Sequence, residues 1–492
     1  MRPSKICLIL WILIALLAGV CVLVPANGWS IGDLQLRWPT LAEVLEIPAD
    51  TTAVQDTVLL AQATEIEEVA EPTIVSTPTD TTPIIHTERP IVVPVVDSIN
   101  ADTRYYMQAF YQSLSTASSR QIRVVHYGDS QIEEDRITKE LRERLQQRYG
   151  GGGVGLIPLH QTIPTLTLHQ SLQMDGTIQS TQGGPRRYIV YGPKSMRLSN
   201  GDYGVMGQVA IMDDSIRTGS EDLRIIVEPM ENQHNYNYFS QIRLLASGID
   251  GQARPLYKGT FSLFQDGIVT LPDSTTSCEI RLQGKGRVYG LSVETPTGVI
   301  VDNIPMRGCS GNIFTQIQRQ ELTDFFSATN TRLIIMQYGG NMIPQTENAS
   351  TLSGYVKGLR RQVEYLRQCA PNASILFIGP SDMSKRIDGE MVTNPLIPYL
   401  DRLLARMAHD EHIGYWSIYQ AMGGYNSMLD WQKRGLAGRD YIHFTRKGAV
   451  KVGNMLTDWL LDIPDFSTPT SNDNTVDTTT NALTDNEFSV NQ

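Results

Sequence analysis

Cysteine is scarce in this sequence, with five residues among 492. Cys7 and Cys21 lie in an apolar segment near the N-terminus, and Cys278, Cys309 and Cys369 are far apart, without the spacing of a zinc site or a disulfide framework. We therefore expect neither a structural metal site nor a disulfide scaffold. The isolated cysteines are expected to be small buried thiols.

Positive charge is also in short supply. The formal net charge is −11 at pH 7, and residues 41–100 contribute most of it, with eleven acidic residues against one arginine, Arg89. Binding to DNA or RNA needs a basic surface that neutralises phosphates, so the composition argues against a nucleic-acid partner. Because the acidity is confined to one stretch, it says little about a substrate.

Long hydrophobic runs are absent except for one, residues 6–24, and the mean hydropathy of −0.19 excludes a polytopic membrane protein. Nineteen apolar residues are about enough to cross a bilayer as a helix. Arg2 and Lys5 precede the run, which predicts a cytoplasmic N-terminus and an exported remainder. We expect residues 1–26 to be an uncleaved signal anchor, with cleavage near Ala26 as the alternative.

Low-complexity composition marks both ends of the remaining chain. Residues 27–100 are rich in Thr, Pro and Glu, and residues 467–492 in Thr, Asn and Asp. Segments with so few apolar residues cannot bury enough surface to fold. We therefore expect a disordered acidic linker and a disordered tail.

The texture of the middle of the chain changes twice. Residues 101–159 and 302–466 alternate β-prone runs with helical patterns, including a helix expected over residues 132–149, and this predicts a parallel sheet covered by helices, an α/β fold. Residues 160–301 instead read as short strands separated by turns, which predicts an inserted all-β sandwich. The strands expected there cover residues 188–191, 208–212, 223–228, 241–245, 259–264, 279–282 and 290–294.

Gly128-Asp129-Ser130 follows a β-prone run, residues 123–127, and precedes the expected helix. Glycine permits a tight strand-to-helix turn, which would present the Ser130 hydroxyl at the carboxyl edge of the sheet, where ligands bind in open α/β folds. The Ser130 N–H could also donate to a developing oxyanion. Taken alone, the tripeptide is a common helix-capping pattern.

Asp440 and His443 lie three residues apart in one segment. This spacing allows a single loop to supply a base and the carboxylate that orients it, so that His443 accepts the Ser130 proton while Asp440 fixes its tautomer. An Asp and a His at this spacing are more often a turn or a helix cap. The other seven histidines lack a comparable context: His86, His126, His160, His169, His234, His409 and His412.

Two further segments could complete an oxyanion site. Gly308 lies in Arg-Gly-Cys-Ser-Gly-Asn, and Asn341 follows two glycines directly after a buried-strand pattern over residues 332–338. Both segments could be ordinary turns. Functionally, the amide of Gly308 and the carboxamide of Asn341 are candidate oxyanion donors.

In order and spacing, these four segments resemble the four sequence blocks of the SGNH/GDSL hydrolases. The resemblance covers about residues 123–159 and 304–461. It implies a flavodoxin-like three-layer fold and acyl transfer through an acyl-enzyme on Ser130, with Asp440 and His443 completing the triad. It also implies that Ser130, Gly308 and Asn341 donate to the oxyanion, and that no cofactor or metal takes part.

The sequence departs from the family pattern at two positions. Gln131 follows the serine where the first block often has Leu or His, and Met342 stands where the third block usually ends in Asp. The oxyanion asparagine is retained, so we expect catalysis to survive.

Gly-Asp-Ser-Gln, the β insertion and export together resemble the peptidoglycan O-acetylesterases of Gram-negative bacteria. This implies a serine esterase that removes O-acetyl groups from a cell-envelope polysaccharide, peptidoglycan among the candidates. It also implies a single-pass inner-membrane anchor and a catalytic domain facing the periplasm. The inserted domain would be carbohydrate-binding-like. We expect its aromatic residues to lie mostly in the core and assign a sugar contact to none of them: Tyr188, Tyr191, Tyr236, Tyr238 and Phe239.

Two alternatives stay open at this point. The same triad could serve a polysaccharide O-acetyltransferase, in which a sugar hydroxyl replaces water as acceptor. The chain could also be a non-catalytic glycan-binding envelope protein on a decayed hydrolase scaffold. An esterase removes acetyl groups from a purified polysaccharide, whereas a transferase adds them when an acyl donor is present. Failure of Ser130 to react with a fluorophosphonate would support the second alternative.

Overall fold

The computed structural model describes residues 29–31, 34–36, 102–174, 177–178, 185–212, 223–230, 234–257 and 259–467. The expected anchor over residues 1–26, and almost all of the expected linker and tail, lie outside these residues. The exception is a short hairpin of β1 (Trp29–Ile31) and β2 (Leu34–Leu36), which belongs to a unit separate from residues 78–492. None of the helices in the described ranges is long and apolar enough to span a bilayer.

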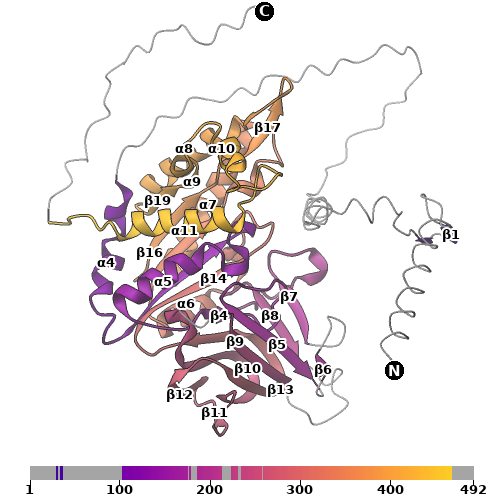
Figure 1. Ribbon diagram of the computed structural model, residues 1–492, viewed down its shortest axis with the longest axis vertical. Helices are drawn as coiled ribbons and strands as arrows, with labels where there is room; N and C mark the ends of the chain where they lie inside the picture. Colours follow the sequence, from indigo (N-terminus) through magenta and orange to yellow (C-terminus); the bar gives the residue numbers. More distant parts are fainter. Residues whose placement is uncertain are drawn as a thin grey trace, which may run out of the picture. The chain divides into compact units, whose positions relative to one another are not determined.

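A five-stranded parallel sheet forms the centre of the α/β part, within the described residues (Figure 1). Its spatial order is β14-β3-β15-β16-β19, and every neighbouring pair is parallel. In chain order this is 2-1-3-4-5, the order of flavodoxin-like doubly wound sheets, the fold that the family resemblance implies. The strands are β3 (Gln121–Gly128), β14 (Gly298–Pro305), β15 (Thr331–Gln337), β16 (Ser374–Gly379) and β19 (Gly414–Ser417).

Helices cover both faces of this sheet because the buried strands are apolar on both sides. Val125 and Ile334 belong to one core with the helices of the first face, and Val124 and Ile335 belong to another core with those of the second. The first face carries α6 (Arg319–Ala328), α7 (Ala349–Cys369) and α8 (Leu396–Asp410). The second carries α4 (Gln108–Leu114), α5 (Thr138–Tyr149) and α11 (Arg446–Leu461), with α5 and α11 side by side in Figure 1.

The helix predicted over residues 132–149 is wrong in its first part. A 3₁₀ helix, η2 (Ser130–Asp135), precedes α5, and its last two residues, Glu134 and Asp135, have φ angles of 59° and 63°. These left-handed residues break the helix. Side-chain interactions hold the kink, because Arg307 binds the Glu133 carboxylate and Arg142 binds that of Asp135.

The inserted part is antiparallel, as predicted, but its hydrogen bonds join all its described strands into one ten-stranded sheet rather than two separate ones. The cause is the length of β10 (Phe239–Pro255) and β13 (Cys278–Glu294), which pair from Gln241–Glu294 to Pro255–Cys278. β13 also pairs with β9 (Leu223–Pro229) near one end and with β4 (Gly155–Ile157) near the other. The strands predicted at residues 279–282 and 290–294 are therefore two ends of β13.

The remaining strands extend this sheet. They are β5 (Leu168–Met174), β6 (Thr177–Ile178), β7 (Arg186–Ile189), β8 (Gln208–Met212), β11 (Ser262–Leu263) and β12 (Ile268–Thr275). Of these, β5, β8 and β12 contribute buried side chains to the apolar core of the insert.

The insert begins and ends earlier than residues 160 and 301. β4 already pairs with β13 of the insert, and the parallel sheet resumes with Gly298, where β14 pairs with β3 over its whole length. In the sequence, the glycines at 150–153 mark a turn that comes before both the predicted start of the insert at residue 160 and its observed start at β4. A turn of this kind therefore places the boundary only to within several residues.

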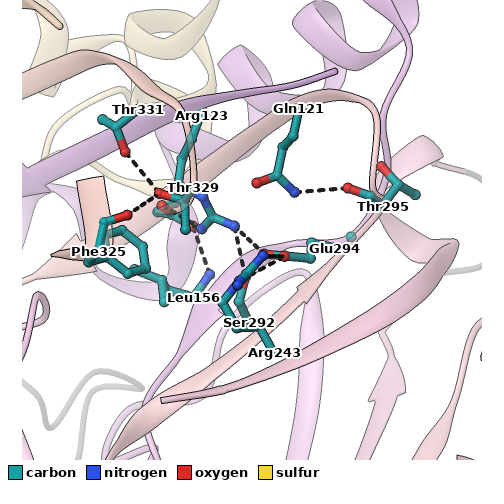
Figure 2. A network of polar contacts seen from close by, with 12 residues as sticks. Gln121, Arg123, Leu156, Arg243, Ser292, Glu294, Thr295, Phe325, Thr329 and Thr331 are labelled. Carbon is teal, nitrogen blue, oxygen red and sulfur yellow. Dashed lines mark hydrogen bonds and ion pairs between the residues drawn. The ribbon is translucent and has the colours of Figure 1, made fainter. Parts of the chain in front are cut away.

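A buried ionic network joins the two parts (Figure 2). Arg123 of β3 donates through Nη1 to both carboxylate oxygens of Asp302 in β14, at 2.8 and 3.0 Å. Its Nη2 binds Glu294 at the end of β13 and the Ser292 hydroxyl, the latter at 3.2 Å. The side chains of Arg123, Glu294 and Asp302 have no exposed surface.

Three of the five cysteines lie in the described residues. Cys278, Cys309 and Cys369 are free thiols and are buried, as expected. Cys7 and Cys21 lie outside the described residues.

Candidate active site

Ser130, His443 and Asp440 form a hydrogen-bonded chain. The Ser130 Oγ lies 3.0 Å from His443 Nε2, and His443 Nδ1 lies 2.7 Å from Asp440 Oδ2. Serine and histidine come from segments 313 residues apart. These distances allow the histidine to accept the serine proton while the carboxylate holds the other ring nitrogen.

The strand-to-helix turn places the serine. β3 ends at Gly128, and Ser130 opens η2, so its N–H lies among those without an acceptor inside the helix. Asp129 caps η2 by accepting the Gln131 N–H at 2.9 Å. The hydroxyl therefore stands at the carboxyl edge of the parallel sheet, as the sequence predicts.

A short closed loop places the histidine and its carboxylate between α10 (Ser427–Lys433) and α11. The Gly438 N–H donates to the His443 carbonyl at 2.8 Å, which closes the loop. Asp440 Oδ1 accepts the backbone N–H groups of Ile442 and His443, both at 3.1 Å. Although burial raises the pKa of Asp440, the hydrogen bonds from His443 and Ile442 bring it below its usual value, so the carboxylate is ionised at neutral pH.

The loop that contains Gly308 lies beside the turn that carries Ser130. Gly308 has a φ of 73°, and a Cβ there would meet no atom within 4 Å, so its backbone faces open space. Its neighbour Arg307 binds Glu133 of η2 through two bonds of 2.7 and 2.6 Å. This bidentate pair ties the glycine loop to the serine turn.

Asn341 lies near the serine turn, but its amide is engaged. Its Nδ2 donates to Asp129 Oδ2 at 3.0 Å and to the Cys309 carbonyl at 3.1 Å. A carboxamide nitrogen has two hydrogens, so both already have acceptors. As an oxyanion donor, Asn341 would have to share or release one of these bonds, whereas Gly308 makes no such demand.

Sequence reasoning missed the role of Gln131. Its Nε2 donates to the Ile442 carbonyl at 2.9 Å, and its Oε1 lies 3.5 Å from the Phe444 N. The side chain thus contacts both neighbours of His443. The departure from Leu or His at this position therefore places an amide that can bind backbone on both sides of the candidate base.

Arg136 makes a second connection of this kind. It donates to the carbonyls of Ser130 and Gln131 in the serine turn, and to the Phe444 carbonyl in the histidine loop at 3.3 Å. Burial lowers the pKa of Arg136, but an arginine stays charged at any ordinary pH. No local pattern marks Arg136 or Gln131 in the sequence, because their partners in the histidine loop lie more than 300 residues away.

Asp129 is a buried carboxyl beside the candidate nucleophile. Burial raises its pKa to about 6, while the hydrogen bond from the Gln131 N–H and the nearby His443 act to lower it. It accepts hydrogen bonds from Gln131 and Asn341. Its contacts make it a positioning residue for the asparagine rather than a group that touches the Ser130 hydroxyl.

We expect the substitution Asp129→Asn to make stability less dependent on pH. The rise in pKa from 3.8 to about 6 means that folding opposes ionisation, so the wild type loses about 2 kcal/mol of stability as pH rises from 4 to 7. The variant lacks this group, and its lost hydrogen bond costs about 1 kcal/mol at every pH. Urea unfolding of both proteins at pH 4 and pH 7 measures the difference.

All other titrating groups are shared by the two proteins, so their difference isolates Asp129. Relative to the wild type, the free energy of unfolding of the variant should rise by about 2 kcal/mol between pH 4 and pH 7. An unchanged difference would contradict the buried, proton-binding state of Asp129.

His126 has a different role. It is fully buried, its Nε2 lies 3.1 Å from Gln337 Oε1, and its Nδ1 lies 2.9 Å from the Thr138 hydroxyl. Burial lowers its pKa to about 3. It is a neutral core histidine and takes no part in the Ser130 chain.

The aromatic residues of the insert do not form a common platform. Tyr236 and Phe239 are buried, while Tyr188 and Tyr191 are packed partly buried against the core. Tyr238 is 45% exposed. Sugar-stacking surfaces therefore do not follow from the aromatic pattern alone. Among the described residues, no group of three His, Cys, Asp or Glu side chains is arranged to hold a metal ion.

Residues 273–450 match the GDSL-like lipase/acylhydrolase family. The matched range contains Gly308, Asn341, Asp440 and His443 but not Ser130. No curated protein sequence matches the chain.

Among the similar solved structures, one shares the fold over most of both chains. A peptidoglycan O-acetylesterase structure is 20% identical, with a TM-score of 0.55, and the match covers 73% of this chain and 95% of the other. The acetyl xylan esterase AlAXEase, 14% identical, has a TM-score of 0.24 over 32% of this chain and 80% of its own. A family 3 carbohydrate esterase of Clostridium thermocellum, also 14% identical, has a TM-score of 0.23 over 33% and 70%.

The family match covers the last three of the four sequence blocks, and the parallel sheet brings the serine turn to them. The hydrolase class predicted from the sequence is thereby confirmed. The chain carries a hydrolase domain of the SGNH/GDSL type, that of the GDSL-like lipases and acylhydrolases.

Proposed function

We propose that this protein is an exported serine esterase that removes O-acetyl groups from a cell-envelope polysaccharide, with peptidoglycan as the first substrate to test. The observation that carries the proposal is the hydrogen-bonded chain from Ser130 through His443 to Asp440, with distances of 3.0 and 2.7 Å. The hydrolase domain supports the reaction class.

Acylation begins at the serine hydroxyl. The Ser130 Oγ attacks the acetyl carbonyl carbon, and His443 Nε2 takes the hydroxyl proton. Asp440 stabilises the imidazolium through the bond to Nδ1. The oxyanion accepts the N–H groups of Ser130 and Gly308, and Asn341 joins them if it gives up one of its two acceptors.

Collapse of this intermediate breaks the bond between the acetyl carbon and the sugar oxygen. His443 returns the proton to the departing sugar oxygen, which leaves the acetyl group on Ser130. Water then attacks the acyl-enzyme, its proton passing to His443 and on to the Ser130 oxygen, and acetate leaves. Both half-reactions use the same three side chains.

The polysaccharide specificity of the proposal is drawn from fold similarity. The peptidoglycan O-acetylesterase structure matches over most of both chains, including the region of the β insert. Its activity is a property of that protein, and we extend it to this chain as a hypothesis. The apolar run at residues 6–24 supports export, with the catalytic domain in the periplasm.

Acetate release tests the proposal. The purified protein should liberate acetate from O-acetylated peptidoglycan and none from the same polymer after alkaline de-acetylation. A fluorophosphonate should label Ser130 and abolish the release. Acetyl groups gained by an added glycan from an acyl donor would instead favour the transferase, and a protein that neither releases acetate nor reacts at Ser130 would refute both.

A further inference from the structure

Three arginines surround one buried carboxylate on the inserted sheet. Glu279 of β13 has no exposed side-chain surface, and its Oε1 accepts from Arg224 Nε at 2.8 Å and Arg281 Nε at 2.9 Å. Its Oε2 accepts from Arg254 Nε at 3.1 Å and Nη2 at 2.7 Å. The arginine side chains remain between 34% and 38% exposed. We call Arg224, Arg254, Arg281 and Glu279 the arginine cluster.

Strand register creates this cluster. Arg281 pairs directly with Arg224 across β13 and β9, and Glu279 pairs with Arg254 across β13 and β10. Side chains alternate along a strand, and Ile280, next to both Glu279 and Arg281, is buried in the core of the insert. The cluster therefore lies on the outward face of the sheet.

The cluster holds more positive charge than Glu279 needs. One arginine can satisfy both oxygens of a carboxylate with a bidentate pair, so three arginines leave two positive charges without a partner carboxylate. This excess stands on a chain whose net charge is −11. Like charges directly opposite each other on neighbouring strands destabilise a sheet, so Arg224 beside Arg281 is a cost that stabilising Glu279 does not explain.

An aromatic ring orders the guanidinium groups. The guanidinium carbons of Arg254 and Arg281 each lie 4.5 Å from the centroid of Phe261. Stacking on an aromatic ring fixes the plane of a guanidinium and leaves its edge free for hydrogen bonds. The partly buried ring also adds apolar surface of the kind that contacts sugars.

We propose that the arginine cluster is a binding site for a polysaccharide that carries carboxylate groups. Guanidinium groups bind carboxylates in a planar, bidentate geometry, and regularly spaced acids on a polymer suit an array of arginines. The site lies at the far end of β13 from Glu294, which contacts the hydrolase part. Glu279 and Glu294 are fifteen positions apart, which at about 3.3 Å per residue corresponds to roughly 50 Å along an extended strand. A polymer chain can therefore occupy this site independently of Ser130, and the proposal stands whether or not the esterase proposal does.

Binding of the full-length protein to polygalacturonate tests this site. We expect the double variant R224Q/R281Q to bind at least about tenfold more weakly than the wild type at low salt. Carboxyl-reduced polygalacturonate, which keeps the sugar chain but lacks the acids, should not bind either protein. Dextran sulfate separates carboxylate recognition from attraction to any anionic polymer, and we expect the wild type to prefer polygalacturonate.

The double variant R360Q/R367Q is a matched control. Arg360 and Arg367 are also exposed and share a carboxylate, Glu411, at 3.2 and 3.3 Å, but they lie on α7 of the hydrolase part. Equal weakening by both double variants, equal affinity for dextran sulfate, or no binding of polygalacturonate by the wild type would overturn the proposal. If R224Q/R281Q does not fold, R281K, which keeps the charge but loses the fork, should weaken binding several-fold and decides the matter.

Discussion

Ser130→Ala should lower the rate of hydrolysis of 4-nitrophenyl acetate by about 10⁴- to 10⁶-fold, because it removes the attacking oxygen while leaving the base in place. The remaining activity would come from the oxyanion donors and from binding. Both proteins should unfold at the same urea concentration, since the hydroxyl makes one hydrogen bond, to His443, at the edge of the site. Steady-state rates at several substrate concentrations measure the loss in kcat.

Ser310→Ala is the matched control for this prediction. Ser310 follows Cys309 in the glycine loop, and the contact that the structure gives it is through its backbone carbonyl, which accepts from the Tyr355 hydroxyl at 2.7 Å. Removal of the Ser310 hydroxyl should change the rate of hydrolysis by less than twofold. A Ser130→Ala protein that keeps a tenth or more of the wild-type rate would show that another group carries the nucleophilic step.

The buried strands β15 and β16 were within reach of the sequence because each contains a continuous apolar run. β15 and β16 are buried on both faces, so their runs stand out against the flanking helices, whose apolar residues recur every three to four positions. Two of the candidate blocks, those of Ser130 and Asn341, directly follow β-prone runs of this kind. For that reason their meeting at one sheet edge could be predicted without any knowledge of contacts.

The kink inside the serine turn could not be predicted from the sequence, because it depends on tertiary contacts rather than on a local pattern. The left-handed residues Glu134 and Asp135 are helix-tolerant types, and the bonds that hold the kink come from Arg307 and Arg142. The partners of Gln131 and Arg136 are also distant in the sequence. Local propensity carries no record of such contacts, so a continuous helix was the natural expectation there.

The β insert shows a similar limit. Alternation predicted its strands, but two of the predicted strands are ends of β13, a single strand of 17 residues. Glycines at 284, 286 and 290 look like turn signals in the sequence. In the structure they lie within β13 at register shifts against β10, where backbone passes so close that a Cβ at Gly286 would meet the Ser247 carbonyl at 1.9 Å.

The substitution Arg123→Met is expected to cost about 3–5 kcal/mol of folding free energy, since it strands two buried carboxylates. Glu294 would keep its bond to Arg243 at 3.1 Å, but Asp302 would keep only the Leu156 N–H at 2.8 Å among the hydrogen bonds of the described residues. The pKa values already differ in the wild type. Burial raises that of Asp302, while Arg123 and Arg243 overcome burial at Glu294 and lower it.

A second substitution identifies the cause of this loss. Adding Asp302→Asn removes the stranded charge, so the double variant R123M/D302N should recover part of the stability, as measured by urea unfolding at pH 7. Arg360→Met, which breaks an exposed pair with Asp410 and Glu411, should cost about 1 kcal/mol or less. A double variant less stable than R123M would mean that Asp302 acts through its hydrogen bond to β4 and not through its charge.

The position of Arg123 gives this network a consequence for the active site. Arg123 stands near the start of β3, and the same strand ends at the turn that presents Ser130. Its partners Asp302 and Glu294 lie in β14 and β13, so one buried cation fixes the strand that carries the nucleophile to both the parallel sheet and the insert. If the insert helps to hold the serine turn in place, Arg123→Met should lower kcat at temperatures where the variant is still fully folded. An unchanged kcat under those conditions would restrict the network to holding the two parts together.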